Sequence, residues 1–210
     1  MNKKILIFIT IFSLALVALS LYIISTIDPG VKPKPTAKIT NVASLNIKAD
    51  KSFNLQDDMG QAFNYANLQN KITVIYFGFA HCPDLCPTVL AKMKESIDLL
   101  NPVELDKIQF VFVSIDPERD SISNLHNFIT QFGGHIKAVT GEQVELKKIA
   151  DSLKVYYAQN SKKDAKEGDD YYVDHSSFIY LLDPQAELIS QFTSDISAEE
   201  MAKQFKMKLQ

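Results

Sequence analysis

The chain has 210 residues, of which 46% are hydrophobic and 22% charged, with two cysteines and no tryptophan. This composition suits one globular domain with an additional terminal segment. The formal net charge is −3, and without Lys3 and Lys4 the rest of the chain carries −5. No basic stripe remains to bind nucleic acid, so the charge argues against polyanion partners and suits a cationic one, such as a metal ion.

A long apolar run near the N-terminus predicts a membrane anchor. Residues 5–27 carry no charged side chain over 23 positions, and a helix that rises about 1.5 Å per residue would cross a hydrocarbon core of about 30 Å. Lys3 and Lys4 precede the run, and no clear small-x-small cleavage site comes before Asp28. We therefore expect residues 1–4 to be a cytoplasmic stub and residues 5–27 a single uncleaved transmembrane helix. The domain that follows is expected on the periplasmic side of a bacterial inner membrane, or in the equivalent topology of the mitochondrial inner membrane.

The remaining chain predicts a linker and one α/β domain. Residues 28–44, rich in proline and lysine, form an extended polar linker, and residues 45–210 form the domain. The segment SFNLQDDMGQAFN predicts a β-hairpin. Continuous β-branched and aromatic runs at 72–79 and 108–115 predict buried strands, and their alternation with helices predicts right-handed crossovers and a sheet covered on both faces. Further expected elements are a helix from Pro87 to Leu100, a helix at 121–131, a strand near 136–139, a helix near 142–153, a strand at 155–159, a charged loop at 161–170, an antiparallel hairpin around Pro184-Gln185 and a final helix capped by Ser197.

The two cysteines concentrate the chemistry at one point. Cys82 and Cys86 follow the first buried strand, where open parallel sheets place their ligand crevices. If Pro87 is the first helical residue, Cys86 is the N-cap, and the helix dipole should stabilise its thiolate. The pair can form a strained local disulfide, act in redox chemistry or bind a soft metal ion. A disulfide across so short a loop would constrain little of the unfolded chain, so we favour a functional pair.

Among the four histidines, His175 is a modest candidate for a second part of the site. It lies in YYVDHSSFIYLLD, just before a predicted strand. His126 falls in a predicted surface helix and His135 in a glycine turn, so solvent exposure explains both. His81 adjoins Cys82, and a residue next to one ligand cannot easily turn to the same centre.

Several other residues have simpler structural explanations. Met93 keeps helical spacing with apolar neighbours and is expected in the core. Asp116 and Arg119 follow the second buried strand, where turn chemistry and a local ion pair are favoured over catalysis. Asp174 either orients the site or is an exposed loop carboxylate, and both readings stay open.

Three motifs, FGFAHCPDLCP, SIDPERD and VDHSSFIYLLDP, occur in this order, and FNLQDDMGQAF precedes them. With these motifs and its N-terminal anchor, the chain resembles the Sco (SenC) family of copper-binding cytochrome c oxidase assembly factors. The resemblance implies a thioredoxin-like fold with an N-terminal β-hairpin and names Cys82, Cys86 and His175 as copper ligands. It also implies cytochrome c oxidase subunit II as a partner, with other copper chaperones and a thiol reductase as further candidates. The chain departs from the family pattern at Ala80-His81 and at Ala186, where a glycine is common.

The donor chemistry agrees with this resemblance. Two thiolates are soft donors for Cu(I), and an imidazole is a third ligand that Cu(II) also tolerates, whereas zinc would usually require a fourth ligand. We expect a membrane-anchored copper metallochaperone for the dinuclear centre of subunit II. The alternative is a thiol-disulfide oxidoreductase or redox sensor, with peroxidase action as a weaker third. The Cys-x3-Cys spacing and the lack of a proline in Val173-Asp174-His175 argue against a general thioredoxin role.

Overall fold

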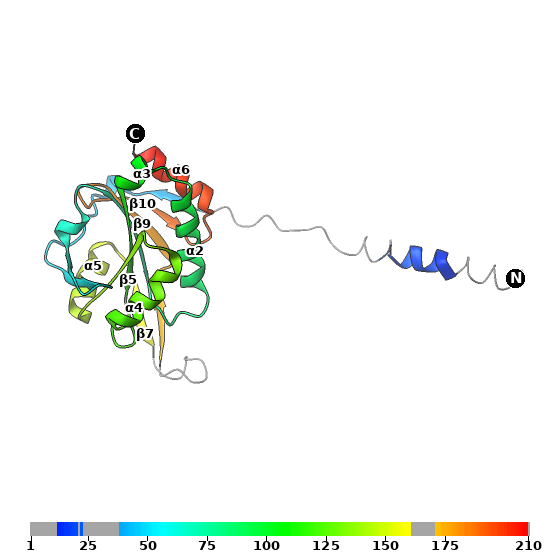
Figure 1. Ribbon diagram of the computed structural model, residues 1–210, viewed down its shortest axis with the longest axis horizontal. Helices are drawn as coiled ribbons and strands as arrows, with labels where there is room; N and C mark the ends of the chain where they lie inside the picture. The colour runs from blue at the N-terminus through cyan, green and yellow to red at the C-terminus, as the bar shows by residue number, and fades with distance from the viewer. Residues whose placement is uncertain (1–11, 21, 23–37, 161–170, 210) are drawn as a thin grey trace, which may run out of the picture. The chain divides into compact units, whose positions relative to one another are not determined.

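The computed structural model describes residues 12–20, 22, 38–160 and 171–209 of the chain (Figure 1). The chain divides into two units, Met1–Thr36 and Ala37–Gln210. In the first unit, residues 12–20 are helical. Within the described ranges, no helix has both the length and the apolar character needed to cross a bilayer. Much of the anchor expected at 5–27 lies outside the described residues, as does the charged loop expected at 161–170.

An eight-stranded mixed sheet forms the centre of the second unit, in the order β1-β10-β9-β4-β5-β6-β2-β3. β4 pairs in parallel with β5, and β5 with β6, while the flanking pairs are antiparallel. The strands of this sheet are β1 (Ile39–Asn41), β2 (Asn54–Asp57), β3 (Ala62–Asn64), β4 (Ile72–Gly78), β5 (Ile108–Ser114), β6 (Ile136–Thr140), β9 (Phe178–Leu182) and β10 (Leu188–Thr193). The helices are α2 (Leu85–Asp98), α3 (Pro102–Asp106), α4 (Ile122–Ile129), α5 (Gln143–Ser152) and α6 (Ala198–Lys208), with short 3-10 helices at Ala43–Leu45, Tyr65–Leu68 and Thr130–Phe132.

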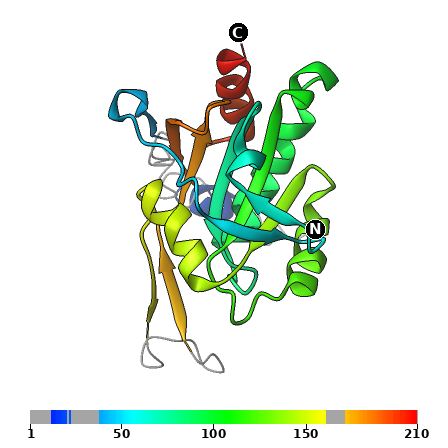
Figure 2. The same ribbon diagram turned by 90° about the vertical axis from the view of Figure 1, so that its left-hand side faces the viewer.

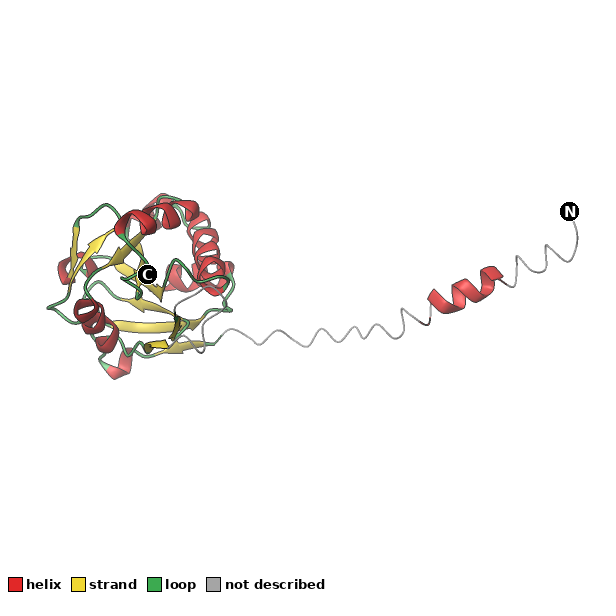
Figure 3. Ribbon diagram, turned by 90° about the horizontal axis from the view of Figure 1, so that it is seen from below, coloured by secondary structure: helices red, strands yellow, loops and turns green. Residues whose placement is uncertain are grey.

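Helices cover both faces of the sheet, as the strand–helix alternation predicts (Figures 2 and 3). Successive residues of a strand point to opposite faces. Val74 and Tyr76 of β4 therefore pack with the buried sides of α2, α4 and α6, while Ile75 and Phe77 pack with α5 and the segment that leads into β2. Every residue of β4 is buried, which explains its β-branched and aromatic sequence.

The N-terminal part of the domain joins the sheet earlier than expected. The predicted hairpin is present as β2 and β3, and β2 also pairs with β6. However, β1 begins at Ile39 and pairs with β10, so the sheet begins inside the segment 28–44 that was expected to be linker.

A separate two-stranded ribbon carries His175. β7 (Tyr157–Asn160) pairs antiparallel with β8 (Tyr172–His175), with Tyr157 opposite His175. Figure 2 shows the ribbon extending away from the main sheet. The expected strand at 155–159 thus begins two residues later, and β8 was not predicted.

Candidate metal centre

The cysteine loop leaves the carboxyl end of the buried strand β4 and enters α2. The helix begins at Leu85 after the N-cap Asp84, so Cys86 is its second residue. The expectation that Pro87 opens the helix and that Cys86 caps it was therefore wrong. The first-turn amides instead surround Cys82, whose Sγ accepts a hydrogen bond from the Cys86 amide at 3.4 Å.

Cys86 is completely buried beneath the loop. The hydroxyl of Tyr76 donates a hydrogen bond to its Sγ at 3.7 Å. A Cβ atom added to Gly78 would lie 2.7 Å from this sulfur and 2.9 Å from the ring of Phe112. Only glycine at the end of β4 therefore leaves room for the sulfur, because such contacts are closer than carbon and sulfur can approach.

His175 reaches the same sulfur from the ribbon. Its Nε2 lies 4.0 Å from Sγ of Cys86. Its Nδ1 lies 3.1 Å from the carbonyl oxygen of Ser176, which can only accept a hydrogen bond. This contact assigns the proton to Nδ1 and leaves the Nε2 lone pair directed to the cysteines, as in metal-binding histidines. The rings of Tyr76 and Phe79 contact the imidazole edge to face at 6.3 and 5.8 Å.

The two thiols differ sharply in acidity. A hydrogen bond from the Cys86 thiol and the backbone amides of residues 84–86 lower the pKa of Cys82 to about 5, against the smaller opposing effect of burial. The hydrogen bond that Cys86 gives to Cys82, its burial and the nearby negative charge raise the pKa of Cys86. The stabilised thiolate is therefore Cys82 and not Cys86, which corrects the expectation from the sequence. At neutral pH the pair consists of one thiolate and one thiol.

The geometry fits a small soft ion after a modest adjustment. Typical metal–sulfur and metal–nitrogen distances of about 2.3 and 2.0–2.1 Å, taken from zinc, would span the 4.0 Å between Cys86 and His175 at an angle of about 130°. Both cysteines are free thiols, so no disulfide occupies their sulfurs. Among the described residues, no three histidine, cysteine or carboxylate side chains are already close enough to form a complete cage. Binding would therefore draw the three donors together.

The structure separates the other candidates from this centre. The side chains of His81 and His126 are about half exposed and lie next to Asp120 and Asp58, respectively, and His135 is exposed. Asp174 is exposed on β8. Met93 is buried in the core, as predicted.

Two carboxylates of the SIDPERD segment hold the ribbon and the cysteine loop, the two segments that carry the candidate residues. Asp116 binds Nε of Arg119 and the hydroxyl of Tyr171, both at 2.5 Å, and the guanidinium lies over the Tyr171 ring at 4.1 Å. These contacts attach the loop after β5 to Tyr171, which lies immediately before β8. The ion pair was predicted, but Tyr171 was not, because its partner lies 55 positions away in the sequence.

The second carboxylate, Asp120, is fully buried. It accepts hydrogen bonds from the amide of Ala80 at 2.8 Å and from the hydroxyl of Ser114 at 2.6 Å, and it faces Nδ1 of His81 at 3.3 Å. Because Ala80 is two residues before Cys82, Asp120 fixes the loop that carries the sulfurs. This contact also explains His81, whose ring turns to Asp120 and not to the centre. The repeated carboxylates in SIDPERD were the available signal for Asp120.

Comparisons with known proteins match most of the chain to one family. The SCO1/SenC family model matches residues 42–210. The SCO2-like protein of Rickettsia typhi is 36% identical over 201 residues, which cover 96% of this chain and 97% of the relative. The copper-bound structure of Bradyrhizobium japonicum ScoI is 35% identical, with a TM-score of 0.66 over 74% of this chain and 96% of that one. The copper-bound structure of Arabidopsis thaliana ScoI is 31% identical, also with a TM-score of 0.66, over 75% and 95% of the two chains.

Proposed function

Because the chain belongs to the SCO1/SenC family and shares its thioredoxin-like fold, we propose that it binds copper through Cys82, Cys86 and His175 and delivers the ion to cytochrome c oxidase. The observation that carries this proposal is the approach of His175 Nε2 to Cys86 Sγ at 4.0 Å, beside the Cys82 thiolate. Two sulfurs suit Cu(I), and the imidazole adds a donor that Cu(II) accepts. The copper-bound Bradyrhizobium and Arabidopsis relatives support this choice of metal.

The client we propose is subunit II of the oxidase, whose dinuclear copper centre would receive the ion. Residues 5–27 would anchor the chain by a single span and place the domain on the periplasmic side, or in the equivalent mitochondrial topology. A shared membrane raises the effective concentration of the encounter without tight affinity. A reporter fused after Gln210 should be active on the outer face; activity in the cytoplasm alone would contradict this topology.

Copper titration of the reduced full-length chain tests the ligand assignment. One copper per chain is expected for the wild type, and Cys82→Ala or Cys86→Ala should abolish binding in the presence of a competing thiol. His175→Ala should weaken Cu(II) more than Cu(I), because two thiolates alone can satisfy linear Cu(I). His135→Ala is the matched control, since His135 is exposed and should leave binding unchanged. Stoichiometric binding by either cysteine variant would refute the assignment.

One observation favours a second function, reduction of client disulfides. A half-buried thiolate of low pKa next to a buried thiol is the arrangement of an attacking and a resolving cysteine. The two functions separate at His175, which copper delivery requires and thiol exchange does not. In a strain that lacks this protein, His175→Ala should fail to restore oxidase assembly if the protein delivers copper. Rescue by His175→Ala at low copper would instead favour the reductase.

A further inference from the structure

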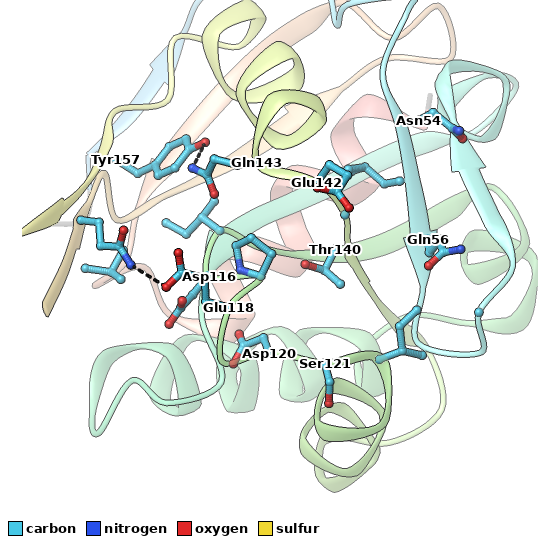
Figure 4. Close-up of a pocket in the computed structure, with 18 of the residues that line it drawn as sticks. Asn54, Gln56, Asp116, Glu118, Asp120, Ser121, Thr140, Glu142, Gln143 and Tyr157 are labelled. Carbon is cyan, nitrogen blue, oxygen red and sulfur yellow. Dashed lines mark hydrogen bonds between the residues drawn. The ribbon is translucent and has the colours of Figure 1, made fainter. Parts of the chain in front are cut away.

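A large pocket lies beside the SIDPERD loop (Figure 4). Its volume is about 1010 Å³, and its walls come from β2, the loop after β5, the end of β6, the N-terminal end of α5 and the ribbon. The carboxyl ends of neighbouring parallel strands β5 and β6 meet there, which is where open α/β sheets bind ligands. The centre proposed above uses none of its residues as ligands.

The pocket is acidic. Asp116, Glu118, Asp120 and Glu142 line it, and no lysine, arginine or histidine is among the described residues of its wall. Asp116 is neutralised by Arg119. Within the described parts of the chain, Glu118 and Glu142 form no ion pair. The N-terminal ends of α4 and α5 also face the pocket and favour anions, but two helix ends supply only about one positive charge together. Negative charge therefore prevails.

A buried hydroxyl in the wall lacks a partner. Thr140, at the end of β6, is 7% exposed. Among the buried side-chain oxygen and nitrogen atoms of the described residues, only its Oγ1 lacks a hydrogen-bond partner. Figure 4 shows this hydroxyl turned toward the loop that carries Asp116 and Glu118. Leaving such a group unpaired is costly, so its position indicates a missing ligand atom.

We propose that this pocket binds an ammonium or guanidinium group, supplied by a basic side chain of a partner protein or by a free polyamine. Such a group carries positive charge for Glu118 and Glu142 and several N–H donors, one of which the Thr140 oxygen accepts. Amide and phenol groups of Gln143 and Tyr157, already bonded to each other at 2.9 Å, provide a polar wall beside the cation.

Calorimetric titration of the copper-free full-length chain in a non-ionic detergent tests the proposal without reference to copper. The probes are spermidine and a peptide of alternating lysine and glycine, at constant ionic strength. We expect 1:1 binding of at least one probe, weakened fivefold or more by Glu118→Gln, by Glu142→Gln and by Thr140→Val. Glu95→Gln, which removes an exposed carboxylate of α2 outside the pocket, should bind as the wild type does.

The outcomes are distinct. Tighter binding of the peptide assigns the cation to a polypeptide, and tighter binding of spermidine assigns it to a free polyamine. Thr140→Val should keep or raise the thermal midpoint while it loses affinity, which separates a binding role from a structural one. Equal affinities for the wild type and the Glu118→Gln/Glu142→Gln double variant, or an equal loss in Glu95→Gln, would overturn the proposal.

Discussion

The acidity of Cys82 makes its reactivity nearly independent of pH across the neutral range. With a pKa of about 5, roughly 90% of Cys82 is thiolate at pH 6, whereas an ordinary cysteine of pKa about 8.5 is about 0.3% ionised. The thiolate population therefore favours Cys82 about 300-fold at pH 6. A thiolate of lower pKa is intrinsically less nucleophilic, which reduces this advantage about 25- to 55-fold. The net prediction is a rate about 5- to 12-fold above that of a reference cysteine peptide at pH 6.

The comparison should reverse at alkaline pH. At pH 8.5 the reference cysteine is half ionised and Cys82 is fully ionised, so the lower nucleophilicity of Cys82 makes it about 12- to 28-fold slower. The assay is alkylation of the reduced full-length chain with iodoacetamide from pH 4 to 9, with mass mapping of the modified cysteine. Cys82 should be labelled with a midpoint near pH 5, and the buried Cys86 should stay unmodified in the folded protein.

A matched variant tests what lowers the pKa of Cys82. The hydrogen bond from Cys86 is the largest contribution to the acidity of Cys82. In Cys86→Ala the pH midpoint of Cys82 labelling should therefore move upward, toward that of the reference cysteine peptide. A wild-type rate that rises tenfold per pH unit between pH 6 and 8, or labelling of Cys86 before Cys82, would refute this account of the site.

Three further predictions concern the metal centre and stability. Between pH 7 and 8, copper affinity should rise tenfold per pH unit, because Cys82 is already ionised and only Cys86, whose pKa is raised, must lose a proton. Calorimetry in buffers of different ionisation enthalpy should give about one proton released per copper ion bound. Two protons released would contradict the assignment. Gly78→Ala should destabilise the fold by about 1–3 kcal/mol in urea unfolding and impair copper binding without removing a ligand, since the new methyl displaces Cys86 Sγ; unchanged binding would show that the contact is not limiting. Lys154→Gly should raise the unfolding free energy by about 1 kcal/mol, because Lys154 follows Leu153, the C-cap of α5, with a φ of 60° that costs a side chain about 1–2 kcal/mol. A loss of stability in the same urea measurement would oppose this.

Local patterns in the sequence predict the buried strands and the caps well. The β-branched and aromatic runs that became β4 and β5 are signals of strands with both faces covered. The Ser197 hydroxyl accepts a hydrogen bond from the Glu200 amide, as expected of an N-cap. The break expected at Asn101-Pro102 is instead the start of α3, with a reciprocal cap between Asn101 and Glu104. The correct predictions of strands and caps depend only on neighbours within a few residues.

The errors arise where several positions satisfy the same local rule or where partners are distant. Proline is tolerated throughout the first turn of a helix, because those amides lack partners there. Pro87 therefore marks the first turn of α2 and not its first residue. The resulting shift of two residues assigned the helix amides to Cys86 when they stabilise Cys82. β8 and its pairing with β7 were missed because strands separated by a long charged segment leave no short-range pattern that fixes their register.

The three proposed copper donors belong to two different sheets. The sulfurs are fixed to the main sheet by way of β4 and α2, whereas His175 ends a ribbon that is a separate sheet. Copper held by all three would act as a cross-link between these two pieces of structure. His175 ends β8 only three positions before β9 begins at Phe178 in the main sheet, so the ion would join the base of the ribbon to the cysteine loop. The hydrogen bond from Tyr171 to Asp116 holds the opposite end of the ribbon to the loop after β5, so the copper-loaded ribbon would be held at both ends.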